Sequence, residues 1–209
     1  MKSMLYLASA SPRRHELLNQ MGVAHEILHV PSPPGEDEPR YVTESPLEYV
    51  QRTAKDKANR AQEWVIKQGL NVKQHAQQTS ILTADTTVAY GDLVLGKPND
   101  AQHASDILKL LSGKTHTVYT ALVLSQSDSD SKHEWRQWQS LSTTLVSFAE
   151  ITQQTIDEYI ATGEPFGKAG AYGIQGQAAK FISRIEGSYS GVMGLPLYET
   201  FEIIRKLNE

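Results

Sequence analysis

Strand-like and helix-like segments alternate along this chain, and two of the strand pairs are joined without an intervening helix. Helical patterns occur at residues 12–21, 46–68, 101–111, 152–161 and 195–207, and strand patterns at 5–8, 26–30, 81–90, 93–95, 116–125 and 140–148. Gly91 and Asp92 fit a tight turn, and the polar stretch 125–132 fits a hairpin tip between the last two strands. Hairpins require antiparallel pairs, so the sequence predicts an α/β fold with a mixed sheet flanked by helices.

The composition is that of an ordinary globular protein, with 39% hydrophobic and 21% charged residues among 209. The chain contains no cysteine, which excludes disulfides, thiol nucleophiles and cysteine-ligated zinc. The formal net charge of -4 argues against a general nucleic-acid binder, but it leaves room for a small pocket that binds an anion. The longest early apolar run, Met4 to Ala8, is too short for a signal peptide or a membrane span. We therefore expect a cytoplasmic protein with no membrane partner.

Two arginines stand in the first turn of the first predicted helix, directly after Ser11 and Pro12. A helix N-terminus carries a partial positive charge, so Arg13 and Arg14 are electrostatically misplaced there. An anion bound to the free backbone N–H groups and to the guanidinium groups would account for them. Alternatively, both side chains extend into solvent or pair with Glu16.

Lys57 falls within the apolar stripe of the second helix, which consists of Val50, Ala54, Ala58 and Ala61. A lysine on the buried face needs an acidic partner or a water-filled cleft, because an unpaired buried charge is costly. The alternative is that its aliphatic stem covers the stripe while the ammonium group reaches solvent.

Asp85 interrupts an otherwise apolar strand, where aspartate is uncommon. It is therefore either an edge residue or a carboxylate placed for chemistry. The acidic run Glu36-Asp37-Glu38 offers a second carboxylate, although such a run can also be only solvated charge. Two carboxylates together with phosphate oxygens suit Mg²⁺ or Mn²⁺.

Eight of the fourteen glycines lie between Gly163 and Gly194. Five of them lie between Gly163 and Gly176, and this density indicates close approach of the backbone to something, or a loop with several left-handed turns. No GxSxG element, HExxH motif or complete P-loop pattern is present, which argues against a serine hydrolase, a zinc protease and a P-loop nucleotidase.

Together these residues form seven ordered motifs that resemble the Maf family of nucleoside triphosphate pyrophosphatases over essentially the whole chain. The motifs are SASPRR, ESPLEYVQR with Lys57, ADTTV, GKP, SGKTH, GEPFGKAGAYGIQG and GSYSGVMGLPL. The KAGAYGIQG form is similar to the branch that acts on dTTP and UTP.

The resemblance implies an elongated α/β fold, with a mixed, curved sheet and two lobes around a central cleft, in one domain over residues 1–209. It also implies hydrolysis between the α- and β-phosphates of a nucleotide substrate, with Mg²⁺ or Mn²⁺ as the cofactor. A homodimer is left open. Roles in nucleotide-pool cleaning and in the arrest of cell division are further expectations.

By motif position, Asp85 is similar to the proton acceptor that activates water, and Glu38 to the second metal ligand beside it. The resemblance implies seven substrate-binding residues, which are Ser9, Arg13, Arg14, Lys57, Thr86, Lys97 and Gln175. Among them, Arg13, Thr86 and Gln175 match positions that determine substrate specificity, and the two lysines match positions that contact phosphate. Gly191 departs from the family pattern, in which asparagine is commoner.

Two other functions remain open at this point. One is a nucleotide-binding regulator of septum formation with little turnover. The other is a hydrolase of the same fold that acts on modified or purine nucleotides. Release of pyrophosphate in the presence of metal distinguishes the enzyme from the regulator, and a nucleotide panel distinguishes the two hydrolases.

Overall fold

The computed structural model describes residues 4–32, 38–69, 78–128 and 134–208. Within these residues the strands are β1 (Met4–Leu7), β2 (Glu26–Ile27), β3 (Thr79–Tyr90), β4 (Leu93–Leu95), β5 (Thr115–Ser127), β6 (Trp135–Phe148) and β7 (Ile182–Glu186). The α-helices are α1 (Pro12–Gln20), α2 (Pro46–Lys67), α3 (Ala101–Leu111), α4 (Gln153–Ala161), α5 (Tyr189–Met193) and α6 (Leu197–Arg205). Short 3₁₀ helices follow at Ala169–Ala171, Gln177–Phe181 and Lys206–Asn208.

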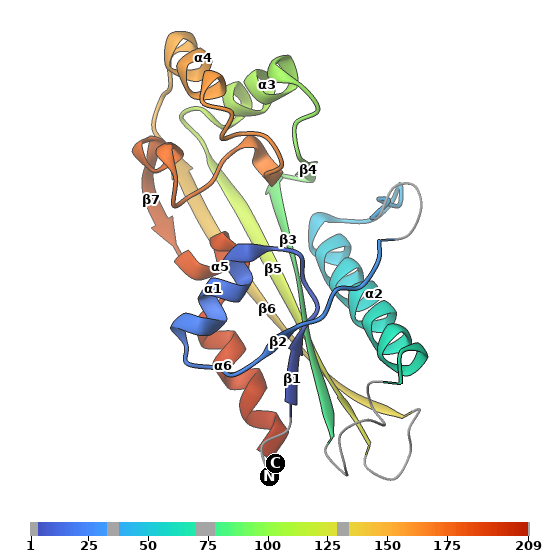
Figure 1. Ribbon diagram of the computed structural model, residues 1–209. Helices are drawn as coiled ribbons and strands as arrows, with labels where there is room; N and C mark the ends of the chain where they lie inside the picture. The colour runs from blue at the N-terminus through green and yellow to red at the C-terminus, as the bar shows by residue number, and fades with distance from the viewer. Residues whose placement is uncertain (1–3, 33–37, 70–77, 129–133, 209) are drawn as a thin grey trace.

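The strands of the described residues form one seven-stranded sheet in the order β2-β1-β3-β5-β6-β7, with β4 paired to β3. Strand β1 is parallel to both of its neighbours, whereas every other pair is antiparallel. The long strands β3, β5 and β6 run most of the length of the elongated molecule (Figure 1). The predicted mixed α/β architecture is therefore confirmed.

Strand β5 shows how helices cover both faces of this sheet. Ala121 and Val123 pack in one cluster with residues of α2, whereas Leu122 and Leu124 pack in another with residues of α1 and α6. This alternation follows from the two-residue period of a strand. In Figure 1, α2 accordingly lies on one side of the long strands and α1 and α6 lie on the other.

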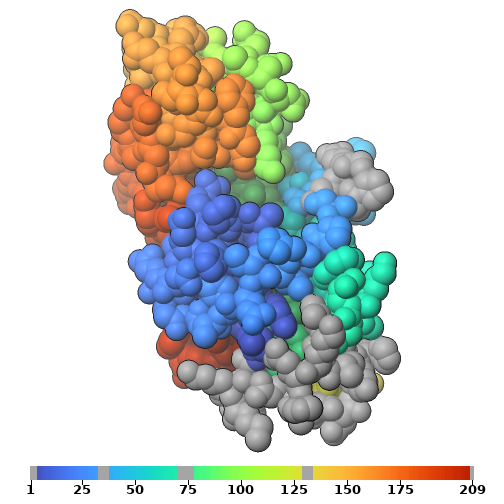
Figure 2. Space-filling model, in the orientation of Figure 1, coloured from blue at the N-terminus to red at the C-terminus, as the bar shows by residue number. Residues whose placement is uncertain are grey.

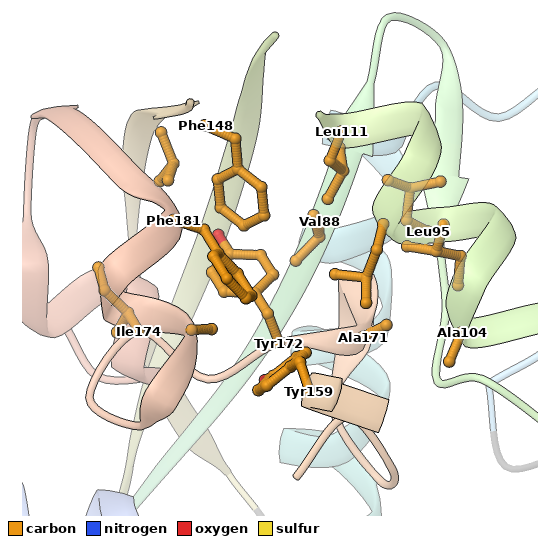
Figure 3. Close-up of a cluster of buried hydrophobic side chains, with 14 of the residues drawn as sticks. Val88, Leu95, Ala104, Leu111, Phe148, Tyr159, Ala171, Tyr172, Ile174 and Phe181 are labelled. Carbon is orange, nitrogen blue, oxygen red and sulfur yellow. The ribbon is translucent and has the colours of Figure 1, made fainter. Parts of the chain in front are cut away.

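A further core cluster lies at the end of the sheet that carries α3 and α4 (Figure 3). Its centre is aromatic, because Phe148 contacts Tyr172 edge to face and lies next to Phe181. Buried His116 belongs to the same group through a 2.8 Å hydrogen bond between its Nε2 and the Tyr172 hydroxyl. Residues of the glycine-rich stretch thus become part of the core at this end.

Several helix boundaries follow from local sequence. Helix α2 begins with the capping box that the sequence predicts, because the Ser45 side chain accepts from the Glu48 backbone and the Glu48 carboxylate accepts from the Ser45 backbone. Asp100 and Thr152 cap α3 and α4, because their side chains accept from the backbone N–H groups of His103 and Thr155. Ser11 stands at the N-cap position of α1, but its side chain makes no capping hydrogen bond.

Two expectations about local structure are wrong. Strand β2 covers only Glu26–Ile27 rather than residues 26–30. The polar segment 125–127 is buried strand rather than hairpin tip, because β5 extends to Ser127. Of the remainder of the predicted tip, Asp128 follows this strand, and residues 129–132 lie outside the described residues. The structure also contains β7 and α5, two elements that the sequence did not predict.

Most of the glycines after Gly163 serve the fold itself. Gly170 adopts φ 70°, and a Cβ there would press against the Val88 side chain. Gly187 adopts φ 126°, and a Cβ would collide with the Thr143 carbonyl. The interpretation of Gly163 to Gly176 as a loop with left-handed turns therefore explains Gly170 without a ligand, and close packing explains Gly187. No helix in the described part of the chain is long and apolar enough to cross a membrane.

Candidate active site

A cleft of about 970 Å³ opens between the N-terminal segments and the glycine-rich stretch. Figure 2 shows the blue N-terminal surface and the orange surface of the later segments on either side of this hollow. Nine residues predicted from the sequence all line it, and they are Ser9, Arg13, Arg14, Glu38, Lys57, Asp85, Thr86, Lys97 and Gln175. We call the first seven the carboxylate wall, and Lys97 with residues 166–175 the glycine-rich wall.

Asp85 lies at the centre of the carboxylate wall, on β3, and its side chain is 7% exposed. Both carboxylate oxygens are hydrogen bonded by residues of α2. Lys57 Nζ donates to Oδ1 at 2.6 Å, and the Thr53 hydroxyl donates to Oδ2 at 2.8 Å. Asp85 is thus a placed carboxylate with a fixed orientation, and Lys57 has an acidic partner instead of only covering the apolar stripe.

The charge state of Asp85 follows from these neighbours. Burial raises the pKa of its carboxyl group. The charge of Lys57 and its hydrogen bond, with smaller contributions from Arg14 and Thr53, outweigh burial and hold this pKa below the usual value of an aspartate. Asp85 is therefore ionised at neutral pH.

Glu38 completes the cluster, because its Oε1 lies 2.5 Å from Lys57 Nζ. One ammonium group thus bridges two carboxylates that come from β3 and from the loop before α2. The other acidic residues of that loop, Glu36 and Asp37, lie outside the described residues. Glu38 is therefore the described loop carboxylate that the structure brings to Asp85.

The loop that carries Glu38 is held by Arg52 of α2, a residue to which the sequence analysis gave no role. Arg52 pairs with both oxygens of Glu44, at 2.6 and 2.9 Å, and donates to the Pro39 carbonyl at 2.8 Å. Its guanidinium group also lies over the Tyr41 ring. The hydrogen bond from Arg52 lowers the pKa of Glu44, so the ion pair persists at neutral pH. Arg52 is the last residue of the ESPLEYVQR motif, and its place in that motif is the sequence signal from which a role could have been predicted.

Arg14 joins Ser9 and Thr86 of the carboxylate wall to Gly194, which also lines the cleft. Its Nε donates to the Gly194 carbonyl at 2.8 Å, its Nη1 to Ser9 Oγ at 3.1 Å and its Nη2 to Thr86 Oγ1 at 3.3 Å. The Thr86 hydroxyl in turn contacts that of Thr120. Three nitrogen atoms of the Arg14 guanidinium group therefore already donate hydrogen bonds within the protein. Burial lowers the pKa of Arg14, with Asp85 and Glu38 acting in the opposite direction.

Arg13 differs from Arg14, although both stand in the first turn of α1. Its Nε is buried and has no hydrogen-bond partner among the described residues. An unpaired buried donor next to a cleft is a feature that a bound anion would satisfy.

The glycine-rich wall presents its side chains differently. Lys97 and Gln175 are exposed, and neither makes a hydrogen bond to another residue in the described part of the chain. Lys168 also lines this wall, and its ammonium group donates to the Glu164 carbonyl. Lys168 belongs to the GEPFGKAGAYGIQG motif, but no role was predicted for it from the sequence.

The carboxylates of the site fit a divalent cation of the Mg²⁺ type. Glu38 and Asp85 offer hard oxygen donors, and a single cationic group already lies between them. Within the described ranges, no group of three or more His, Cys, Asp and Glu residues could hold a metal alone. Substrate phosphates and water would therefore have to complete the coordination.

A buried ionised carboxylate and several cations in one cleft define a site for polyphosphate chemistry, and comparisons with known proteins agree. The chain matches the Maf family, described as Maf-like protein, over residues 4–207. The protein therefore belongs to the Maf family.

Curated relatives are similar over nearly their whole length. A dTTP/UTP pyrophosphatase of Bordetella avium is 52% identical over 202 residues, which are 97% of this chain and 94% of the relative. A dTTP/UTP pyrophosphatase of Cupriavidus metallidurans is 48% identical over 210 residues, 99% of this chain and 98% of the relative. A crystal structure of a nucleoside-triphosphatase from Mycobacterium abscessus aligns with 12% identity, over 71% of this chain and 75% of that one. Its TM-score of 0.34 is too low to support an argument.

Proposed function

We propose that this protein hydrolyses dTTP and UTP between the α- and β-phosphates, releasing the nucleoside monophosphate and pyrophosphate with the help of a divalent metal. The name shared by its relatives of about 50% identity supports the substrate class. The observation that carries the proposal is the ionised Asp85 in a cleft that also holds Arg13, Arg14, Lys57 and Lys97.

This concentration of cations matches what a triphosphate requires. Phosphoryl transfer depends on positioning and on neutralising charge, so several cations have to surround one polyphosphate. A chain with a net charge of -4 gathers them in one cleft. Arg13 at the start of α1 binds one phosphate together with the free N–H groups of that helix.

Asp85 accepts the proton of the attacking water in this proposal. In the structure its Oδ1 is occupied by the Lys57 ammonium group, and its Oδ2 by the Thr53 hydroxyl. When a triphosphate enters, Lys57 turns to a phosphate oxygen and frees Oδ1 for the water. Thr53 keeps its hydrogen bond and holds the carboxylate plane in place.

Glu38 and Asp85 would hold the metal ion. When bound, such an ion neutralises charge on the phosphates and lowers the pKa of bound water. Arg52 contributes indirectly, because it holds the loop from which Glu38 reaches Lys57.

Gln175 recognises the base in this proposal. Its carboxamide offers both a donor and an acceptor, which can pair with the imide edge of uracil or thymine. That edge presents an N–H group between two carbonyl groups, so an amide binds it with two complementary hydrogen bonds.

A panel of nucleoside triphosphates, assayed with Mg²⁺ and with Mn²⁺, tests the proposal. We expect dTTP and UTP to give equal amounts of monophosphate and pyrophosphate, with lower kcat/KM for CTP, ATP and GTP. Binding without turnover would instead favour the regulator of septum formation. A preference for purine or modified nucleotides would favour the other hydrolase. The cytoplasmic location, the homodimer and a role in division arrest stay predictions.

A further inference from the structure

Glu164 belongs to the GEPFGKAGAYGIQG motif but not to the cleft lining, and its carboxylate accepts three hydrogen bonds. Its Oε2 accepts from the Gln177 backbone N–H at 2.9 Å. Its Oε1 accepts from the Tyr159 hydroxyl at 3.0 Å and, more weakly, from the Ala178 backbone N–H at 3.4 Å. Two of the three donors belong to the backbone that directly follows Gln175.

The space around Glu164 explains two glycines of the same loop. A Cβ at Gly176 would overlap the Glu164 carboxylate, so no side chain fits at that position. A Cβ at Gly173 would approach the Lys168 stem at 3.1 Å, and the Lys168 ammonium group donates to the Glu164 carbonyl. Both flanks of Gln175 therefore pack closely against Glu164 or against the lysine bonded to it.

The charge of Glu164 suits this role. Burial raises the pKa of its carboxyl group, but the hydrogen bonds from Gln177, Tyr159 and Ala178 outweigh burial and lower the pKa overall. An ionised carboxylate accepts from several N–H and O–H donors at once and forms stronger bonds than a neutral amide.

The Gln175 side chain has no such support of its own. It is exposed in the cleft and makes no hydrogen bond to another residue that the structure describes. Its direction is therefore set by the backbone of residues 173–178, whose position depends on Glu164.

We propose that Glu164 is a positioning residue for Gln175 and thereby determines how strictly the site selects uracil and thymine over other bases. This inference rests on the proposed function. Glu164 itself does not touch the nucleotide and acts only through the loop.

Glu164→Gln is the direct test, because the amide keeps the shape but presents its NH₂ group to backbone N–H donors. We expect the ratio of kcat/KM for UTP to that for CTP to fall about tenfold, since small misplacements of a binding group are costly. The value of kcat for UTP should change less than about threefold, because the carboxylate wall is untouched. Tyr159→Phe removes one of the three donors and should give a smaller fall in the same ratio.

Glu158→Gln is the matched control, because Glu158 is exposed on α4 and its carboxylate accepts, among the described residues, only from Gln154. Its ratio should equal that of the wild type. Thermal unfolding measures the stability of each variant independently of its activity. If Glu164→Gln does not fold, the ratio of kcat/KM for UTP to that for CTP in Tyr159→Phe is the test instead.

If the ratio of kcat/KM for UTP to that for CTP is unchanged in active Glu164→Gln protein, the inference is overturned and the proposed function is unaffected. The same holds for an unchanged ratio in Tyr159→Phe where Glu164→Gln does not fold. An equal loss of kcat/KM for every nucleotide would assign Glu164 a purely structural role and overturn it as well. Wild-type protein without activity on UTP and dTTP would overturn the proposed function together with this inference.

Discussion

The two walls of the cleft are organised by different interactions. In the carboxylate wall, the side chains are held by other side chains. Lys57 pairs with both Glu38 and Asp85, and Arg14 donates hydrogen bonds to Ser9 and Thr86. In the glycine-rich wall, the Gln175 side chain makes no such bond to any residue that the structure describes, and the backbone that follows it is fixed instead. Ion pairs and hydrogen bonds between side chains therefore hold the carboxylate wall in place, whereas contacts of the backbone hold the glycine-rich wall.

This difference separates two properties of an enzyme. Fixed charges near phosphates govern the rate, because they stabilise charge that develops during the reaction. Backbone-positioned hydrogen-bonding groups govern the choice of base, because a mismatched edge leaves buried polar groups unpaired. Substitutions in the carboxylate wall should thus lower the rate for all nucleotides, and substitutions in the glycine-rich wall should change their ranking.

The largest effect is expected for Asp85→Asn. Asparagine keeps the shape of the side chain but loses the charge and the ability to accept a proton. We expect kcat to fall at least about a hundredfold for every nucleotide, the usual scale for a general base. Pyrophosphate release measures the effect, and circular dichroism checks that the protein is folded. Near-normal release from folded protein would contradict the role given to Asp85.

Arg13→Ala should weaken the binding of every nucleotide at least about tenfold, since a hydrogen bond to a charged group contributes about 1.5–3 kcal/mol. The difference from wild type should shrink as salt screens the charge. Calorimetric titration with a non-hydrolysable triphosphate measures it. Arg184→Ala is the control, because Arg184 is exposed on β7 and its one ion pair in the described part of the chain is with Glu186. Equal affinities in wild type and Arg13→Ala would show that Arg13 does not contact phosphate.

Gln175→Glu should change the ranking of nucleotides with little effect on the best kcat. The carboxylate keeps the length of the side chain but loses the donor, so one carbonyl of the base would face a charge. We expect the ratio of kcat/KM for UTP to that for GTP to fall about tenfold. If the ranking of UTP, CTP and GTP is the same in both proteins, base selection lies elsewhere.

The smallest effect on activity is expected for His116→Gln, which instead changes how stability depends on pH. Burial lowers the pKa of His116 to about 4 from an ordinary value of 6.5. The unfolded chain then binds more protons than the folded protein between these values, so stability falls as the pH drops from about 6.5 towards 4. This histidine should cost the wild type about 2 kcal/mol between pH 7.5 and pH 5.

Denaturant unfolding at these two pH values measures the difference. In His116→Gln the loss on acidification should be smaller by about that amount. His103→Gln on α3, a position outside this aromatic cluster, should behave like the wild type. A loss on acidification that is equal in wild type and His116→Gln would show that His116 is protonated within the folded core.

Local patterns in the sequence were sufficient for much of the fold. The capping box of Ser45 and Glu48, the apolar stripe of α2 and the turn at Gly91 each depend on residues close in sequence. Strand β7 and helix α5 could not be predicted, because both are five residues long and lie among glycines. Their structure depends on partners such as β6, which is distant in sequence.

In the cleft, too, contacts between residues that are distant in sequence could not be predicted from local patterns. The misplaced Arg13, the lysine on an apolar stripe and the aspartate within a strand could each be recognised as unusual from local rules. That Lys57 joins Asp85 to Glu38 could not be predicted from those rules, because the three residues come from separate elements. The use of Arg14 to connect Ser9, Thr86 and Gly194 is likewise a product of tertiary structure.

The hydrogen bond from Arg14 to Gly194 joins residues 180 positions apart. A growing chain in which α5 has not yet been made therefore has β1, α1 and β3 but lacks the acceptor that orients Arg14. Contacts of such long range form late, because the entropy of closing the intervening loop opposes them until other structure has shortened it. The order of synthesis and folding thus makes the orientation of Arg14 one of the last features of the cleft to be completed, after the strands β1 and β3 beside it.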